Sequence, residues 1–459
     1  MTECNQESFA FEAHFSRRVE AGFTGGEISS DGGALLLREV ERKLNLFARL
    51  AGCFTDQRAA DRVEHSLESM LRQRIFALTM GYEDLNDHEQ LRRDPLFALI
   101  SGKRDLAASL AGKSTLNRLE LSSQSVSRTK RYHKLSYAPA AIDELLATLF
   151  IESHRSAPEE IVLDLDATYI PLYGHQPERF FHGYYDAYCY LPLYIFAGDQ
   201  LLCARLRPAN QDAAKGAVDE VERIARQLRA RWPDVRIVLR ADSGFCREEL
   251  MAWCEREENK VDYVFGLARN ARLAKIIGKE MHAAKIEHER TEKPARVFAG
   301  FAYQTRKSWS CARRVVAKAE HLDKGANPRF IVTSLAASTI TDKWNDRTLY
   351  EKFYCARGEM ENRIKEQMCL FAYRLSTEEM RANQLRLYFS ALAYTLMEAL
   401  RRLALKGTEW AEAQVDTIRL KLLKIGAKIK LSVRRIVLEL SSAYPWKHLY
   451  VQAYQALRS

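Results

Sequence analysis

The feature that most constrains the fold is an alternation of strands and helices between residues 159 and 270. "EEIVLDLDATYI" and the two halves of "LPLYIFAGDQLLCARLRP", joined by a Gly-Asp turn, have the pattern of three successive strands. A helical pattern from Ala214 to Leu228, the strand "VRIVLRAD", a helix over about 246–257 and the strand "VDYVFGLAR" follow. This order predicts an α/β sheet covered by helices, in which ligands bind at the carboxyl ends of strands.

Two aspartates occupy unusual positions in these strands. Asp242 directly follows "VRIVLRA", and Asp166 lies within the first strand, two residues after Asp164. Asp242 alone has the simple interpretation of a helix cap. A carboxylate inside a central strand, however, costs several kcal/mol unless a cation or hydrogen bonds compensate it. Clustered carboxylates repel one another and a divalent metal ion reverses that cost, so the pattern indicates a metal site.

A third candidate segment is the helix predicted over "YCARGEMENRIKEQM". Spacings of three and four residues place one phenol, one guanidinium, one carboxylate and one ammonium on the same face: Tyr354, Arg357, Glu361 and Lys365. The spacing alone favours an ordinary salt-bridged helix with a solvated face.

The three segments together resemble the signatures of DDE transposases of bacterial insertion sequences. The matching motifs are "DAT" at 166–168, "RADSGF" at 240–245 and Tyr-x2-Arg-x3-Glu at 354–361, which is similar to the branch with a Tyr-Arg-Glu-Lys signature. The long gap before Glu361 resembles families with a β-rich insertion there. That branch has its lysine seven residues after the glutamate, whereas this chain has Met368 there and Lys365 one turn earlier.

The resemblance implies a ribonuclease H-like core in which Asp166, Asp242 and Glu361 are catalytic and bind two Mg²⁺ or Mn²⁺ ions. Asp166 rather than Asp164 is implied because these families place the aspartate two residues before a threonine. DNA contacts are implied for Tyr354, Arg357 and Lys365. The implied partners are double-stranded DNA, as terminal inverted repeats and as target, and further copies of the chain in a homodimer or higher oligomer.

Two alternatives stay open: a ribonuclease H-like nuclease that cuts without joining, and a catalytically inactive, domesticated DNA-binding protein. The formal net charge of +10 over 459 residues favours a polyanionic partner. No apolar run approaches the ~20 residues of a spanning helix, and the start lacks a signal-peptide pattern. We therefore expect no membrane association and a cytoplasmic protein, and the resemblance implies a bacterial, nucleoid-associated one.

The chain is predicted to comprise five regions. They are a helical DNA-binding and synapsis region at 1–155, the two parts of the core at 156–270 and 346–405, a β-rich insertion at 271–345, and a basic region for DNA contact or dimerisation at 406–459. A basic, linker-like segment is expected at 122–139.

Two basic stretches are candidate DNA surfaces. From Arg296 to Phe330 there are eight Lys or Arg and two acids, typical of a DNA-facing insertion or of a solvated basic edge. Trp309, at a turn in that stretch, is predicted either to stack on an unpaired base or to belong to a local core. Residues 417–448 hold eight Lys or Arg and one acid, and their alternation predicts a strand pair that contacts DNA or mediates dimerisation.

Overall fold

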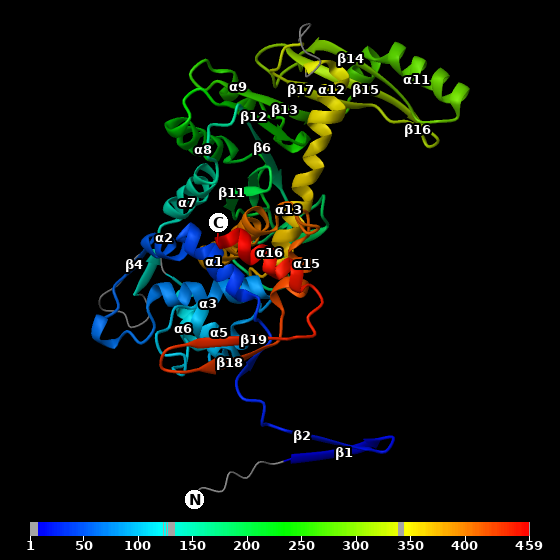
Figure 1. Cartoon of the computed structure of the whole chain (residues 1–459). Helices are drawn as coiled ribbons and strands as arrows, with labels where there is room; N and C mark the ends of the chain where they lie inside the picture. The colour runs from blue at the N-terminus through cyan, green and yellow to red at the C-terminus, as the bar shows by residue number, and fades with distance from the viewer. Residues whose placement is uncertain (1–7, 123, 125, 127–133, 338–343, 459) are drawn as a thin grey trace, which may run out of the picture. The chain divides into compact units, whose positions relative to one another are not determined.

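Figure 1 shows the computed structural model of the chain, which describes residues 8–122, 124, 126, 134–337 and 344–458. The chain forms two compact units. The first, here the terminal unit, comprises Met1–Tyr137, Cys369–Phe371 and Leu392–Ser459; the second, the core unit, comprises Ala138–Met368 and Ala372–Ala391. Within the described residues, no helix is long and apolar enough to span a membrane.

The core unit is built on one mixed sheet. Its first five strands in spatial order are β11 (Gln200–Arg205), β10 (Leu193–Ala197), β6 (Glu160–Ala167), β12 (Arg236–Ala241) and β13 (Val261–Leu267). β6, β10 and β11 are antiparallel neighbours, whereas β12 runs parallel to β6 and β13 parallel to β12. The structure thus confirms the predicted α/β, ribonuclease H-like core.

Helices bury their apolar faces against this sheet. In α8 (Ala217–Arg231), Val221, Ile224 and Leu228 recur at spacings of three and four residues and are fully buried. Burial of each such side chain stabilises the fold by roughly 1.5–3 kcal/mol. The other helices of this part are α7 (Pro139–Glu152) and α9 (Glu248–Glu255). α7 packs on β11 and α8, so it belongs to the core unit and not to the predicted N-terminal region.

The strands predicted for the insertion continue the same sheet. β17 (Arg329–Thr333) pairs with β13, followed by β15 (Arg313–Leu322) and the edge strand β14 (Ala295–Tyr303), while β16 (Gly325–Ala326) pairs with β15. Their apolar residues share one cluster with those of β6 and β12, so this region is not a separate domain. Two helices that the sequence analysis did not predict, α10 (Ala271–Ile276) and α11 (Gly278–Thr291), precede it.

The segment that carries Tyr354 and Glu361 is not one uniform α-helix. After α12 (Asp346–Thr348) the chain forms the π-helical turn η5 (Leu349–Tyr354) and the 3-10 turn η6 (Cys355–Arg357). Only then does α13 (Gly358–Cys369) begin, and α14 (Met380–Leu400) follows it. The π turn lies before Arg357, and the Tyr354 phenol and the Arg357 guanidinium interact electrostatically across the 3-10 turn.

The terminal unit combines both ends of the chain. Its helices are α1 (Ala34–Leu44), α2 (Leu46–Gly52), α3 (Leu67–Met80), α4 (His88–Leu91), α5 (Pro95–Ile100), α6 (Lys113–Glu120), α15 (Val415–Ile418) and α16 (Lys447–Arg458). β1 (Ser8–His14) pairs with β2 (Arg17–Gly22), and β4 (Phe54–Asp56) with β5 (Leu135–Tyr137). β19 (Ile436–Leu440), β18 (Ala427–Leu431) and β3 (Ile28–Ser29) form a three-stranded sheet. Half of the basic segment expected at 122–139 lies outside the described residues.

Candidate active site

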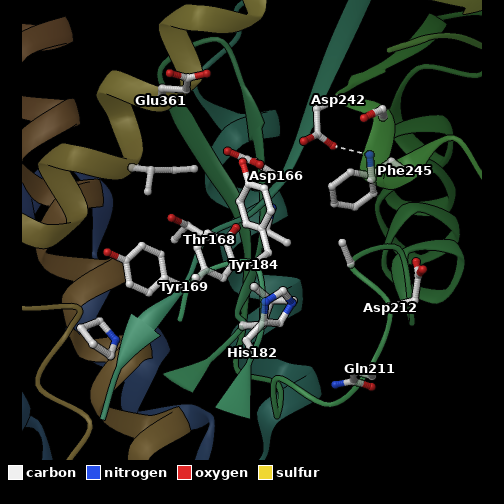
Figure 2. Close-up of a pocket in the computed structure, with 18 of the residues that line it drawn as sticks. Asp166, Thr168, Tyr169, His182, Tyr184, Gln211, Asp212, Asp242, Phe245 and Glu361 are labelled. Carbon is white, nitrogen blue, oxygen red and sulfur yellow. Dashed lines mark hydrogen bonds between the residues drawn. The ribbon is translucent and has the colours of Figure 1, made fainter. Parts of the chain in front are cut away.

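Two acidic side chains meet where β6 and β12 end. The strands are parallel and in register, with Asp164 opposite Arg240 and Leu165 opposite Ala241, so the next pair is Asp166 and Asp242. Figure 2 shows both carboxylates at this edge of the sheet. Asp242 Oδ1 accepts the Gly244 N–H at 2.8 Å and caps the 3-10 turn η3 (Ser243–Phe245). Asp242 is therefore both the cap of η3 and one of the two acids of this site.

The preceding acid on β6 has a different environment. Asp164 accepts two hydrogen bonds from Arg240, at 2.5 Å from Nε and 2.7 Å from Nη2, and both side chains are buried. Arg240 Nη1 also donates to the Phe353 carbonyl at 2.5 Å. One guanidinium thus joins β6, β12 and the turn before α13. Asp164 is the partner of a buried cation, whereas Asp166 lines an open cavity.

The electrostatics of this edge favour a bound cation. Burial, and then the neighbouring charge of Asp242, raises the pKa of Asp166 to about 6, although Arg357 opposes the shift. Burial and the charges of Asp166 and Asp242 also raise the pKa of the Tyr185 phenol to about 12. Two mutually repelling carboxylates are hard oxygen donors, so these residues fit a divalent ion such as Mg²⁺ or Mn²⁺.

The cavity in front of the two aspartates has a volume of about 930 Å³. Its walls include a group of aromatic side chains and a histidine: Tyr169, Tyr184, Tyr185, Phe245, Tyr373 and His182. Several come from a small sheet of β7 (Ile170–Pro171), β9 (Ala187–Tyr190) and β8 (Phe180–His182) and from its turns. Tyr169 stacks on Tyr185 with ring centroids 4.4 Å apart. The sequence analysis assigned these rings no role, although the density of aromatic residues in "FFHGYYDAYCY" is visible in the sequence.

Glu361 lines the same cavity from α13 but stands apart from the two aspartates (Figure 2). Its carboxylate accepts a hydrogen bond from Arg357 Nη2 at 3.2 Å. Among the described residues, no three His, Cys, Asp or Glu side chains are close enough together to hold a metal ion. The structure therefore brings together two of the three predicted ligands and leaves the third at the cavity wall.

The remaining predicted residues of this segment lie around the cavity. Lys365 and Met368 both line it, one turn apart on α13. The Tyr354 hydroxyl lies close to the backbone of Gly266, which is itself next to the backbone of Asp242. A methyl group added to Gly266 would lie only 2.6 Å from the hydroxyl oxygen. Burial is the main reason that the pKa of Tyr354 is raised.

Trp309 lies in the core of the sheet. It is 7% exposed, meets Tyr303 edge-on at 5.8 Å and has the Arg313 guanidinium over its ring at 5.5 Å. The guanidinium occupies a face of the ring that a stacked base would need. Of the two predicted roles, this burial favours the local core, and we assign Trp309 no DNA contact.

Much of the positive charge between Arg296 and Phe330 is neutralised in the fold. Arg313 forms ion pairs of 2.6 Å with both Glu248 and Glu255 of α9. Elsewhere in this stretch, Arg314 pairs with Asp346, and Arg296 and Lys318 with Glu320. Four of the eight counted cations therefore already have acidic partners, and a DNA-facing role for this stretch stays a prediction.

The raised pKa of Asp166 gives a test in metal-free protein. Unfolded, Asp166 loses its proton near pH 3.8; folded, it keeps the proton up to about pH 6. The folded state is thus penalised by its ionisation as the pH rises through this window. Relative to wild type, Asp166→Asn is expected to gain about 1–3 kcal/mol in unfolding free energy between about pH 4 and about pH 7.

Urea denaturation at several pH values measures this gain, with exposed Asp234→Asn as control. A difference between Asp166→Asn and wild type that does not change with pH would show that Asp166 ionises normally.

The ribonuclease H-like sheet, with paired carboxylates at the ends of adjacent parallel strands, places the chain among α/β proteins with a candidate acidic metal site. The family model "Transposase DDE domain group 1" matches residues 11–459, and the chain belongs to this family. The resemblance to DDE transposases is thereby confirmed. Among solved structures, a cryo-EM piggyBac transposase synaptic complex with hairpin DNA matches 86% of this chain and 80% of that chain, with 11% identity and a TM-score of 0.43. No curated protein matches the chain.

Proposed function

We propose that this chain is the transposase of a bacterial insertion sequence, acting on DNA in the cytoplasm. In this proposal it binds the terminal inverted repeats, cleaves DNA by metal-dependent phosphoryl transfer and joins the 3′ ends to target DNA. One observation carries the proposal: Asp166 and Asp242 lie next to each other in an open cavity that Glu361 also lines. The family to which the chain belongs supports it.

Asp166 and Asp242 would hold the divalent ions, with Glu361 as the third ligand. When bound, two such ions activate water or a DNA 3′-hydroxyl and stabilise the departing oxygen of an in-line displacement. In this proposal a DNA segment would reach the carboxylates through the cavity of about 930 Å³, whose wall carries exposed residues such as Tyr184.

Arg357 would exchange partners when DNA enters. In the structure its guanidinium hydrogen-bonds Glu361 and acts electrostatically on Asp166. A phosphate offers the guanidinium a bidentate contact, which a single 3.2 Å bond to a carboxylate does not. In our proposal a phosphate replaces Glu361 as the partner of Arg357. The Glu361 side chain is then free to turn toward the aspartates. Tyr354 would hydrogen-bond the DNA backbone, and Lys365 would add positive charge at the cavity.

The test is incubation of a duplex that contains the element end, and a target duplex, in Mg²⁺, Mn²⁺, Ca²⁺ or EDTA. Specific cleavage and joined products in Mg²⁺ or Mn²⁺ are expected, and none in EDTA. Cleavage without joining would identify a nuclease, and end binding without cleavage in any metal would identify an inactive DNA-binding protein. Two or more copies of the chain are expected per pair of ends, measurable by sedimentation of the complex.

The lysine of the α13 segment gives a second test. If Lys365 contacts a phosphate, Lys365→Ala lowers the slope of log affinity against log salt by about one unit and weakens cleavage accordingly. Added to Lys365→Ala, the change Met368→Lys should partly restore the slope and the cleavage, because position 368 also lines the cavity and lies one turn away. Arg357→Lys should be poorly tolerated, since an ammonium cannot reproduce a bidentate guanidinium contact.

Cleavage and binding of an end duplex over a salt series measure all three variants. An unchanged rate and slope for Lys365→Ala would reduce Lys365 to a solvated charge on a helix.

A further inference from the structure

The sheet β19-β18-β3 of the terminal unit presents a basic ribbon to solvent. β18 and β19 form a hairpin in which Lys428 is opposite Glu439 and Ile429 is opposite Leu438. One face is apolar and covered, with Ala427 and Ile429 buried. Because side chains alternate along a strand, Lys428 and Lys430 lie on the other face, and both are exposed, with Lys430 paired to Glu439 at 2.6 Å. We call residues 427–440 the basic ribbon.

The turn of the basic ribbon borders a groove of about 350 Å³. Three guanidinium groups line it: Arg104 from the loop after α5, and Arg434 and Arg435 from the turn. Of the groove-lining residues only Asp105 is acidic, and it already accepts the Ala107 N–H at 3.0 Å. Throughout the described part of the chain, none of the three arginines forms an ion pair.

Apolar side chains accompany these cations. Val433 at the turn is fully exposed, and Leu431 and Ile436 beside it are 47% and 45% exposed. Unpaired cations next to exposed apolar groups mark a surface that a polyanion with apolar edges would cover. The contrast with β14 and β15 is direct, because there the arginines already have acidic partners.

We propose that the basic ribbon and Arg104 bind duplex DNA of the element end, with the turn in a groove and the arginines on the flanking phosphates. A two-stranded ribbon fits the major groove, which is about 12 Å wide. The surplus of unpaired cations favours DNA over a second copy of this chain, whose own net charge is +10. The inference rests on the proposed function only in taking an element end as the ligand.

The test is fluorescence anisotropy of a labelled terminal-repeat duplex, without divalent metal, from about 50 to about 200 mM KCl. Removing two phosphate contacts in Arg434→Gln/Arg435→Gln should lower the salt slope by about 1.8 and weaken affinity about 30-fold near 0.15 M salt. The two side chains are exposed and unpaired, so the variant should melt like wild type. Arg434→Lys/Arg435→Lys, which keeps the charge, should retain most of the slope.

The matched control is Arg226→Gln/Arg231→Gln on the exposed side of α8, which removes the same charge. Equal slopes for the ribbon variant and this control would overturn the inference. A change in the self-association of the ribbon variant, with an unchanged salt slope, would also overturn the inference. Cleavage of the same duplex in Mg²⁺ by wild type separates the two proposals. Binding without cleavage contradicts only the proposed function, and cleavage with equal slopes contradicts only the ribbon.

Discussion

Asp166→Ala or Asp242→Ala is expected to lower cleavage and joining of an end-containing duplex by about 100-fold or more. In the proposed mechanism each carboxylate would help to hold ions that supply several kcal/mol of transition-state stabilisation, and each 1.4 kcal/mol is about tenfold in rate. Glu361→Ala should have a similar effect if Glu361 completes the site. End binding should change little, since basic contacts dominate affinity for DNA.

Asp212→Ala is the matched control. Asp212 lines the same cavity, but it is half exposed and pairs with Arg247 at 2.9 Å. It should cut within a few-fold of the wild-type rate. Gel shifts and cleavage on one labelled duplex separate binding from chemistry. An Asp166→Ala variant that cut at the wild-type rate, while Asp164→Asn folded normally and did not cut, would transfer the catalytic role to Asp164.

Arg240→Met is expected to lower the free energy of unfolding by about 3–5 kcal/mol, because it leaves the Asp164 carboxylate buried without its cation. The exchange also removes the donor to the Phe353 carbonyl, which fixes the turn before α13. The additional change Asp164→Leu should recover much of the stability, since an apolar pair can replace a buried ion pair.

Arg236→Met, on the same strand, is the control. Its ion pair with Asp262 is partly exposed, so the expected loss is about 1 kcal/mol or less. Urea denaturation of the single and double variants measures these differences. Equal losses for Arg240→Met and Arg236→Met would show that the buried pair contributes no more than an ordinary surface pair.

Local patterns were sufficient for much of the fold. Alternation along β6 and β12 and helical spacing along α8 depend only on neighbouring residues, so the order of elements could be predicted. Two carboxylates at strand positions of one sheet also predicted that Asp166 and Asp242 share a metal site. The hairpin of β18 and β19 was predicted from the alternation of apolar and basic residues along both strands.

Only the tertiary structure decided which charges are available. Arg313 looked free in the sequence, but its partners Glu248 and Glu255 lie about sixty residues away and meet it only when β15 joins the sheet. Asp164 likewise finds Arg240 through strand pairing. Ion pairs between distant segments leave no periodic signal, because they depend on which strands become neighbours.

The same holds for the position of single side chains. Trp309 lies at a turn in the sequence, yet contacts with Tyr303 and Arg313 bury it. The predicted helix begins with a 3-10 turn, and a π turn precedes it. The sequence by itself thus determined the strands and covering helices of the core and the acids that end its central strands, since these follow from local periodicity. Burial, ion pairing and the separate position of Glu361 were decided by packing between segments far apart in the chain.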